Sequence, residues 1–157
     1  MKTIQFPLIC LLALVLQAAE PSKPPVFEIR LVLDKPALDS EQMTCAPRKP
    51  GEVAEVLNVQ RTPLIDQKAL KSACVQSEPA SGLPYVQLTF TEQGAKRFAE
   101  VTAQNIHKRL AIVIDGKLFS APMVESQITG GSAQITGNFS QKEATDLAAK
   151  LNDAAKE

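Results

Sequence analysis

The sequence predicts an α+β fold, a single domain in which helices pack on one face of a mainly antiparallel sheet. Segments with alternating apolar residues, typical of half-buried strands, are interspersed with segments of helical periodicity. From residue 85 onward their order is strand, helix, strand, strand, strand, helix. Asp115-Gly116, a favoured pair for a two-residue hairpin turn, joins two of these strands and makes them antiparallel.

Length and charge limit the class of protein. The chain has 157 residues, enough for one domain, and 17 basic residues balance 17 acidic ones, which argues against nucleic-acid binding. The apolar stretch after Lys2 is short for a membrane span and predicts a cleaved signal peptide over residues 1–19, followed by a proline-rich spacer over 20–25. Retention of this stretch as an anchor is the alternative. The mature chain, without a transmembrane segment, is expected in the periplasm or secreted.

Residues 26–84 are expected to form N-terminal strands, a loop and a short helix. Alternating apolar residues predict strands in 26–34 and 55–61, and prolines predict mostly loop in 35–52. Asp66 is a suitable N-cap for a helix running through 67–75.

The two cysteines of this region are expected to pair. In an oxidising compartment an even number of thiols favours a Cys45–Cys74 disulfide, which would stabilise the chain by roughly 3 to 4 kcal/mol on the chain-entropy model. A redox-active or metal-binding pair is the alternative, although the C-x-x-C spacing and further ligands are lacking.

Residues 85–157 carry the clearest patterns. Strands are predicted in 85–90 and 110–115, a helix capped by Thr91 in 92–109, and a return strand in 117–124 that Pro122 ends or confines to an edge. The stripe expected on that helix consists of Ala95, Phe98, Ala99, Thr102 and Ile106. A glycine-rich loop and another strand follow in 128–139. Ser140 and Glu143 then form a capping box before a helix whose apolar stripe is Ala144, Leu147, Ala148 and Leu151.

The sequence predicts no catalytic, cofactor or metal site. Its single histidine, His107, is expected on the surface at a helix end, and a nucleophilic triad or zinc site needs more partners than this chain offers. The run "TGGSAQITG" lacks the lysine of a phosphate loop, so Gly130, Gly131 and Gly137 are interpreted as turn or bulge residues, like Asp115-Gly116. We therefore expect no enzyme activity and no cofactor.

One stretch is a candidate binding site. Apolar residues beside an unpaired strand edge can accept an extended peptide by strand addition. The candidate edge consists of Phe119, Ser120, Pro122 and Met123. The alternative is that these residues only contribute to the core.

Residues 85–154 also resemble a known family, the head subdomain of the first periplasmic domain of SecD, in the SecDF complex that assists protein export. The matching stretches are "VQLTFTEQGAKRFAEVTAQN", "KRLAIVIDGKLFSAPMVESQI", "GGSAQITGNFS" and "QKEATDLAAKLN", with "TPLIDQKALKSA" as a weaker match before them. SecD proteins also have transmembrane helices and a base subdomain. In place of that base subdomain this chain has only residues 26–60.

The resemblance implies a non-enzymatic periplasmic module that binds translocating or unfolded polypeptide, with the export machinery as a further partner. It implies no catalytic role for Asp115-Gly116 or for residues 120–122. An accessory envelope domain that binds one folded partner is the first alternative. A hydrolase with an unrecognised site is the second, and the scarcity of histidine counts against it.

Overall fold

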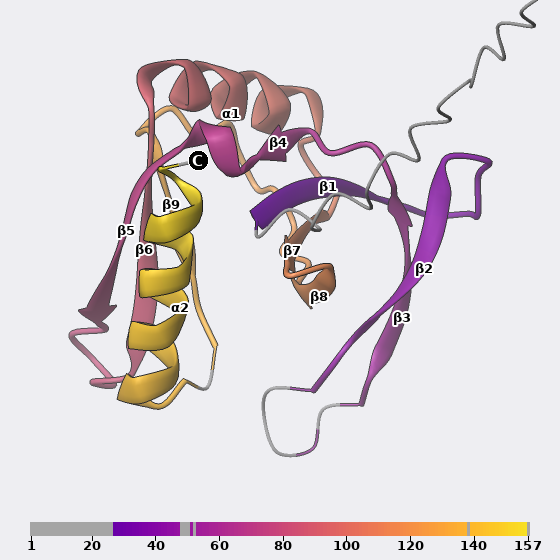
Figure 1. The fold of residues 1–157 in the computed structure, drawn as a ribbon. Coiled ribbons are helices and arrows are strands. Elements are labelled where there is room, and N and C mark those ends of the chain that lie inside the picture. Colours follow the sequence, from indigo (N-terminus) through magenta and orange to yellow (C-terminus); the bar gives the residue numbers. More distant parts are fainter. Residues whose placement is uncertain (1–26, 48–50, 52, 138, 157) are drawn as a thin grey trace, which may run out of the picture.

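The computed structural model describes residues 27–47, 51, 53–137 and 139–156, and shows the α+β fold that the sequence predicts (Figure 1). Within these residues two antiparallel sheets and two α-helices form one small domain. None of the helices described is long and apolar enough to cross a membrane. The predicted signal peptide (1–19) and spacer (20–25) lie outside the described residues.

The larger sheet combines strands from the N-terminal region with two strands from the second half of the chain. Its strand order is β2-β3-β1-β7-β8, with β4 also paired to β1. The strands are β1 (Phe27–Leu33), β2 (Ser40–Cys45), β3 (Glu55–Gln60), β4 (Ile65–Asp66), β7 (Leu110–Ile114) and β8 (Lys117–Ser120). Strand β1 pairs with β7 from Phe27 to Leu31 and with β3 at Val32 and Leu33, so regions 26–84 and 85–157 share one sheet.

The smaller sheet has the order β5-β6-β9 and carries the helices. Its strands are β5 (Leu70–Ser77), β6 (Pro84–Phe90) and β9 (Ser132–Ile135), and the helices are α1 (Glu92–Gln104) and α2 (Gln141–Ala154), with a 3-10 turn, η1 (Gln67–Ala69), before β5. Figure 1 shows α2 running along this sheet and α1 lying across one end of it. Helix α2 therefore packs against the smaller sheet, mainly along β5, while α1 lies at its end.

The main core lies between the two sheets and both helices. Phe27 of β1, Val86 of β6 and Leu151 of α2 are fully buried in it. The Phe90 and Phe98 rings lie with their centroids 4.8 Å apart, which adds an aromatic contact to the apolar packing. This core confirms that alternate residues of 26–34 and 85–90 face inward.

A second, smaller core fills the concave face of the larger sheet. Leu57 and Val59 of β3, Ala111 and Val113 of β7, and Leu118 of β8 are buried there. Strand β7 therefore has a core on each face, which explains why all five of its residues are buried.

Two expectations for the N-terminal region are wrong. Residues 35–52 are not mostly loop, because β2 lies among them and pairs with β3 over six residues, between the prolines that indicated a loop. Residues 67–75 do not form a helix. Asp66 does accept a hydrogen bond from the Lys68 backbone N–H, but the cap starts only the single turn η1 before β5 begins. Pairing of β5 with β6 overrides the local capping signal.

The helix predicted for 92–109 is shorter in the structure. Thr91 caps it as expected, yet α1 ends at Gln104 with Asn105 as its C-cap. Phe98 and Thr102 of the predicted stripe are buried, whereas Ile106 lies beyond the helix and is exposed. The side chain of Asn105 donates to the Val101 carbonyl at 2.8 Å and helps to end the helix.

The predicted Cys45–Cys74 disulfide is absent from the structure. Both thiols are free. Cys45 lies on β2 of the larger sheet, whereas Cys74 is exposed on β5 of the smaller one. The sequence predicts a helix over 67–75, whereas in the structure Cys74 is exposed on strand β5.

The capping box of α2 is confirmed, and its removal should destabilise the fold. The Ser140 hydroxyl accepts from the Glu143 backbone N–H at 3.2 Å, and the Glu143 carboxylate accepts from the Ser140 backbone N–H at 2.8 Å. Ser140→Ala should lower the free energy of unfolding by about 1 kcal/mol in urea titrations. Ser140→Asp, which keeps a capping oxygen, should cost less, and equal losses in both variants would contradict this role.

Candidate functional site: the groove beside strand β8

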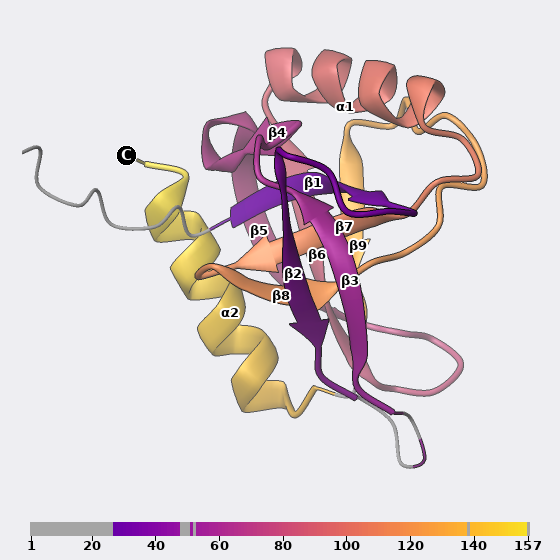
Figure 2. The same ribbon diagram turned by 90° about the vertical axis from the view of Figure 1, so that its right-hand side faces the viewer.

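The candidate site lies where the two ends of the larger sheet converge. Strands β2 and β8 stand at opposite ends of its strand order, and curvature of the sheet brings them into contact (Figure 2). The Cys45 thiol on β2 lies 3.7 Å from the Phe119 carbonyl on β8, as a weak hydrogen-bond donor. From this contact the two strands diverge, as Figure 2 shows.

A groove of about 850 Å³ opens between the diverging strands and α2. Consecutive residues of both strands line it, 41–44 from β2 and 117–119 from β8. Because neighbouring residues of a strand point to opposite faces, a run of consecutive lining residues means that the strand edges face the groove. Within the described residues β8 has β7 on one side and no strand on the other.

Apolar side chains line the groove near the point of convergence. The Phe119 ring stacks on the Phe139 ring with the centroids 5.4 Å apart, and both side chains are half-buried. Leu147 of α2 and Met43 of β2 add to this surface. These side chains form the apolar part of the groove lining.

Charged side chains also line the groove, and Asp115 among them belongs to the β7–β8 turn. Four carboxylates, Glu41, Asp115, Glu143 and Asp146, stand against two ammonium groups, Lys117 and Lys150. Lys150 pairs with Asp115, and Lys142, just outside the groove, pairs with Asp146 at 2.5 Å. Glu143 accepts hydrogen bonds from the backbone N–H and hydroxyl of Ser140, which lower the pKa of its carboxyl, and the charge of Lys142 lowers it further.

The structure brings only part of the predicted edge to this groove. Phe119 lines it, whereas Ser120 lines a second cavity of about 640 Å³. Pro122 and Met123 are exposed beyond the end of β8, where Met123 forms an isolated bridge with Arg109. Pro122 follows the strand and ends it, as the sequence predicts.

The second cavity contains an ion pair that ties β3 to the chain after β8. The Arg109 guanidinium binds both carboxylate oxygens of Glu55, at 2.7 and 2.9 Å, and donates to the Ala121 carbonyl at 2.8 Å. The bidentate hydrogen bond lowers the pKa of Glu55 and raises that of Arg109. Because both partners are occupied by each other, the pair has a structural role.

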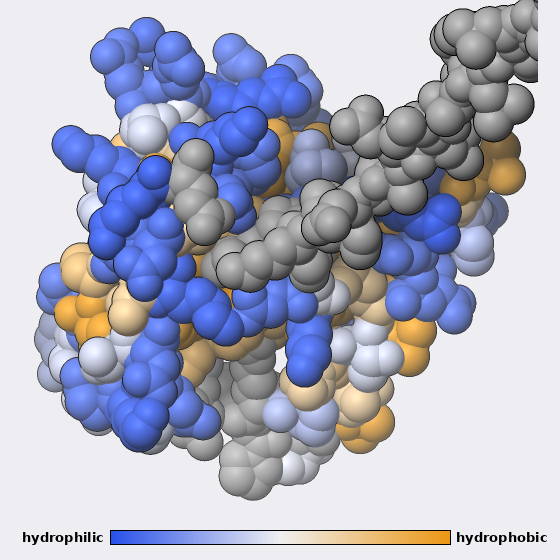
Figure 3. Space-filling view, viewed as in Figure 1, coloured by the Kyte–Doolittle hydropathy of each residue, from blue (hydrophilic) through white to orange (hydrophobic). Residues whose placement is uncertain are grey.

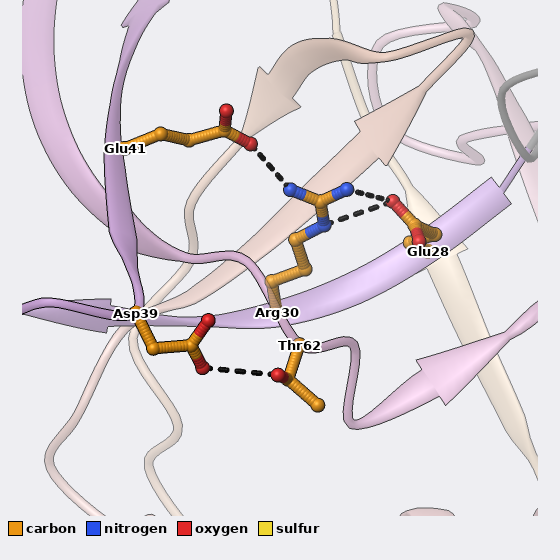
Figure 4. A network of polar contacts seen from close by, with 5 residues as sticks. All are labelled: Glu28, Arg30, Asp39, Glu41 and Thr62. Atoms are coloured by element: carbon orange, nitrogen blue, oxygen red, sulfur yellow. Dashed lines mark hydrogen bonds and ion pairs between the residues drawn. The ribbon is translucent and has the colours of Figure 1, made fainter. Parts of the chain in front are cut away.

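A buried ion network supports the groove and was not predicted from the sequence. Arg30 of β1 donates from Nε to Glu28 at 2.8 Å and from Nη1 to Glu41 at 2.7 Å (Figure 4). Glu28 is 4% exposed, so Arg30 links a buried carboxylate to one that lines the groove. The only signal in the sequence is the pair of opposite charges two residues apart on a predicted strand.

Another edge of the structure is closed by a side chain. Asn152 of α2 accepts from the Ala73 backbone N–H and donates to the Ala73 carbonyl, both at 2.8 Å, so it occupies the main-chain groups in the middle of β5. Natural sheets commonly cover their edges against unwanted pairing. This contact closes the middle of the β5 edge.

The residues predicted to form turns or bulges lie outside the helices and strands. Asp115 and Gly116 have φ values of 50° and 72°, as a type I′ hairpin requires. Gly131, at φ 65°, directly precedes β9, Gly130 lies in the loop before it, and Gly137 lines the second cavity. His107 is exposed where the chain leaves α1, and its φ of 63° is a left-handed value that the sequence did not indicate. Among the described residues no group of three metal-ligating side chains occurs.

The surface facing the viewer in Figure 3 is mainly hydrophilic, with hydrophobic residues in small separate groups. The exposed apolar side chains include Val53, 86% exposed, and Val56 of β3, 58% exposed. Val53 lines the second cavity, whereas the Phe119–Phe139 stack lines the groove beside β8. The β8 groove is therefore the place where apolar side chains, strand edges and charges come together.

Comparison with known proteins gives a consistent result. The family of SecDF P1 head subdomains matches residues 32–155. SecD of Acidaminococcus fermentans is 35% identical over 126 residues, which cover 80% of this chain and 30% of that protein. SecDF of Thermus thermophilus is 53% identical over 74 residues, 47% of this chain and 10% of that protein. The chain thus spans less than a third of the length of these relatives.

Solved structures agree. A SecDF structure described as a membrane component that enhances protein export is 34% identical, with a TM-score of 0.65 over 82% of this chain and 62% of that chain. SecDF in a super-membrane-facing form is also 34% identical, with a TM-score of 0.66 over 82% and 18% of the two chains. The match starting at residue 32 extends the likeness beyond residues 85–154, to β2 and β3.

Proposed function

Because the chain belongs to the family of SecDF P1 head subdomains, we propose that it is a non-enzymatic periplasmic module of protein export, which binds extended segments of translocating or unfolded polypeptide in the groove beside β8. The proposal rests mainly on one observation, namely that a strand edge and a stack of two aromatic rings line the same groove. The β8 edge faces a groove whose floor is formed by Phe119 and Phe139.

Strand addition is the mode of binding that fits this geometry. An extended peptide placed in the groove would form main-chain hydrogen bonds with a strand edge that lines it, and alternate side chains would enter the apolar part of the groove. Main-chain recognition depends little on sequence, as a protein that contacts many exported chains requires. The groove volume of about 850 Å³ lies within the usual range for binding sites.

Phe119→Asp should weaken binding of a fluorescein-labelled, permanently unfolded polypeptide by at least about tenfold, because a carboxylate would be buried against Phe139. Fluorescence anisotropy measures the affinity, and circular dichroism checks that the variant is folded. Met123→Asp is the matched control, since Met123 is exposed outside the groove and its replacement should leave binding unchanged. A folded Phe119→Asp protein that binds as tightly as the wild type would contradict the proposal.

Photo-cross-linking in cells from a photoreactive residue at position 119 tests the export role. We expect a spread of newly exported polypeptides together with subunits of the export machinery. Position 123 provides the control outside the groove. One dominant folded partner would instead favour the alternative, an accessory envelope domain unrelated to export, and loss of every cross-link would remove support for both.

A further inference from the structure

We infer that the free edge of strand β2 receives the extended polypeptide, through the main-chain groups of Gln42 and Thr44, and that the bound segment places one apolar side chain against Met43. This inference rests on the proposed function and names the edge and the class of side chain that the groove selects. It follows from the direction of the main-chain hydrogen bonds of β2, the lack of protection along this edge and the packing of Met43.

The main-chain groups of β2 point alternately to strand β3 and to the groove. The Arg61 backbone N–H donates to the Asp39 carbonyl at 3.0 Å, which makes these residues a hydrogen-bonded pair just before the β2–β3 ladder. Such pairs recur at every second residue of an antiparallel ladder, and the register of β2 against β3 is unbroken. The N–H and C=O groups of Gln42 and Thr44 therefore point away from β3.

These four main-chain groups lie open to the groove. Gln42 and Thr44 both line it, and both residues are exposed. Within the described part of the chain no strand pairs with this side of β2, and no other hydrogen bond reaches the main chain of either residue there. A row of unpaired N–H and C=O groups is a template for an added strand.

The β2 edge also lacks the protection that other strands of this domain have. Natural edge strands are commonly guarded by lysine, proline, a bulge or a covering element. Strand β2 contains no lysine or proline and has no bulge against β3. By contrast, the register of β8 shifts around Phe119, whose carbonyl accepts from the Cys45 thiol, and Asn152 closes the middle of β5. We therefore assign the accepting edge to β2.

Met43 determines the side chain that the segment must carry. Met43 packs against the smaller core, to which Leu118 of β8 belongs, and both residues line the groove. Every pairing of the described strands is antiparallel, so the added segment is expected to be antiparallel too. Its residue opposite Met43 is then in a non-hydrogen-bonded pair, in which the Cα atoms are about 4.5 Å apart and the side chains are closest. An apolar side chain there extends the smaller core, whereas a charged one would lose hydration.

The neighbours of that apolar residue are selected by their main chain alone. Their side chains point to the same face as those of Gln42 and Thr44, which is exposed and carries no charge at these two positions. Their N–H groups are needed for hydrogen bonds to β2, so proline is excluded there. The groove thus selects an extended segment with one apolar residue between two residues of almost any kind. Exported polypeptides of unrelated sequence meet this requirement.

Amide hydrogen exchange measured by NMR tests which edge is used. In the free protein the amides of Gln42 and Thr44 should exchange rapidly, whereas that of Met43 is bonded to β3 and should exchange slowly. Saturation with the permanently unfolded polypeptide of the anisotropy assay should slow exchange at Gln42 and Thr44 by at least about tenfold. Binding without this protection would overturn the inference and leave the proposed function intact, and failure to bind would overturn both. Protection that rises with protein concentration, without polypeptide, would indicate pairing of two copies and also overturn the inference.

Three further peptides test the alternation on the side of the ligand. The parent is a run of serine and threonine with one central valine, which fixes the register opposite Met43. N-methylation of the residues flanking the valine removes donors that face β2 and should weaken binding roughly three- to tenfold for each lost hydrogen bond. N-methylation of the valine itself should have a much smaller effect, because its N–H faces away from β2. Replacing the valine with glutamate should weaken binding by at least about tenfold. Equal effects of N-methylation at all positions would overturn the inference.

Gln42→Pro tests the same hydrogen bond on the side of the protein. Proline removes only the N–H that faces the groove and is tolerated on an edge strand, so the pairing of β2 with β3 should persist. We expect the affinity for the parent peptide to fall roughly three- to tenfold. Gln134→Pro is the matched control, because Gln134 lies on the edge strand β9, outside the groove, and this variant should bind normally. A folded Gln42→Pro protein that binds like the wild type would overturn the inference. The peptide comparison uses the unaltered protein and decides the question if this variant does not fold.

Discussion

Replacing Arg30 with methionine should lower the free energy of unfolding by about 3 to 5 kcal/mol, measured by urea denaturation followed by circular dichroism. Arg30 donates two hydrogen bonds to one carboxylate oxygen of Glu28, whose side chain is 6% exposed. Methionine preserves much of the volume of arginine but leaves the Glu28 carboxylate buried without a cation. The cost is that of an uncompensated buried charge, which far exceeds the net stabilisation from an intact ion pair.

The double variant Glu28→Leu/Arg30→Met separates this explanation from simple loss of packing. Both side chains lie beside the apolar core of the concave sheet face, where β1 pairs with Val113 and Ala111 of β7. Removing both charges should therefore recover most of the stability that the single change loses. Lys150→Met, which breaks the exposed pair with Asp115, should cost less than about 1 kcal/mol. A single Arg30→Met change as mild as Lys150→Met would show that the network contributes little.

The Glu28–Arg30–Glu41 network also shows what the sequence leaves open. Alternation in 26–34 predicts one buried face, and Phe27 and Ile29 do lie in the main core. It cannot predict that the opposite face is covered as well, because the cover is β2 and β3, brought there by curvature of the sheet. In a flat sheet Glu28 and Arg30 would lie on the exposed face, but curvature of this sheet encloses them.

Local signals were right where tertiary structure agreed with them. Thr91, the capping box at Ser140 and the hairpin at Asp115-Gly116 act as predicted, because each depends on a few neighbouring residues. Asp66 is a genuine cap too, but pairing of β5 with β6 ends its helix after one turn. The residues around Asp66 do not by themselves determine whether a helix or strand β5 forms after it.

The candidate site was predictable only in part, for the same reason. Phe119 was identified from its place in an apolar segment next to an expected edge. Its surroundings come from β2 and α2, which lie far from it in the chain. Most of the charges that line the groove also belong to those distant elements. Spacing within the sequence cannot show that Glu41, Asp115 and Asp146 line one groove.

Gly94→Ala should lower the free energy of unfolding by about 3 kcal/mol, although alanine in a helix interior is normally favoured over glycine by about 1 kcal/mol. A Cβ atom at Gly94 would lie 2.4 Å from the Ala69 carbonyl oxygen and 2.9 Å from the Ala69 Cα. Both are backbone atoms, and the same oxygen accepts a hydrogen bond from the Thr91 N–H at 2.8 Å. Relief of the clash would move η1 away from the start of α1 and break that bond.

Two further variants show whether close packing is the cause. Gly130→Ala should be nearly neutral, because nothing lies within 4 Å of a Cβ atom there. Ala69→Gly, combined with Gly94→Ala, removes the contact with the Ala69 Cβ but keeps the carbonyl oxygen at 2.4 Å, so it should not restore stability. Recovery in this double variant would assign the clash to the side chain of Ala69. If Gly94→Ala itself were stabilising, helix propensity would outweigh the contact, and α1 could not be as close to η1 as the structure places it.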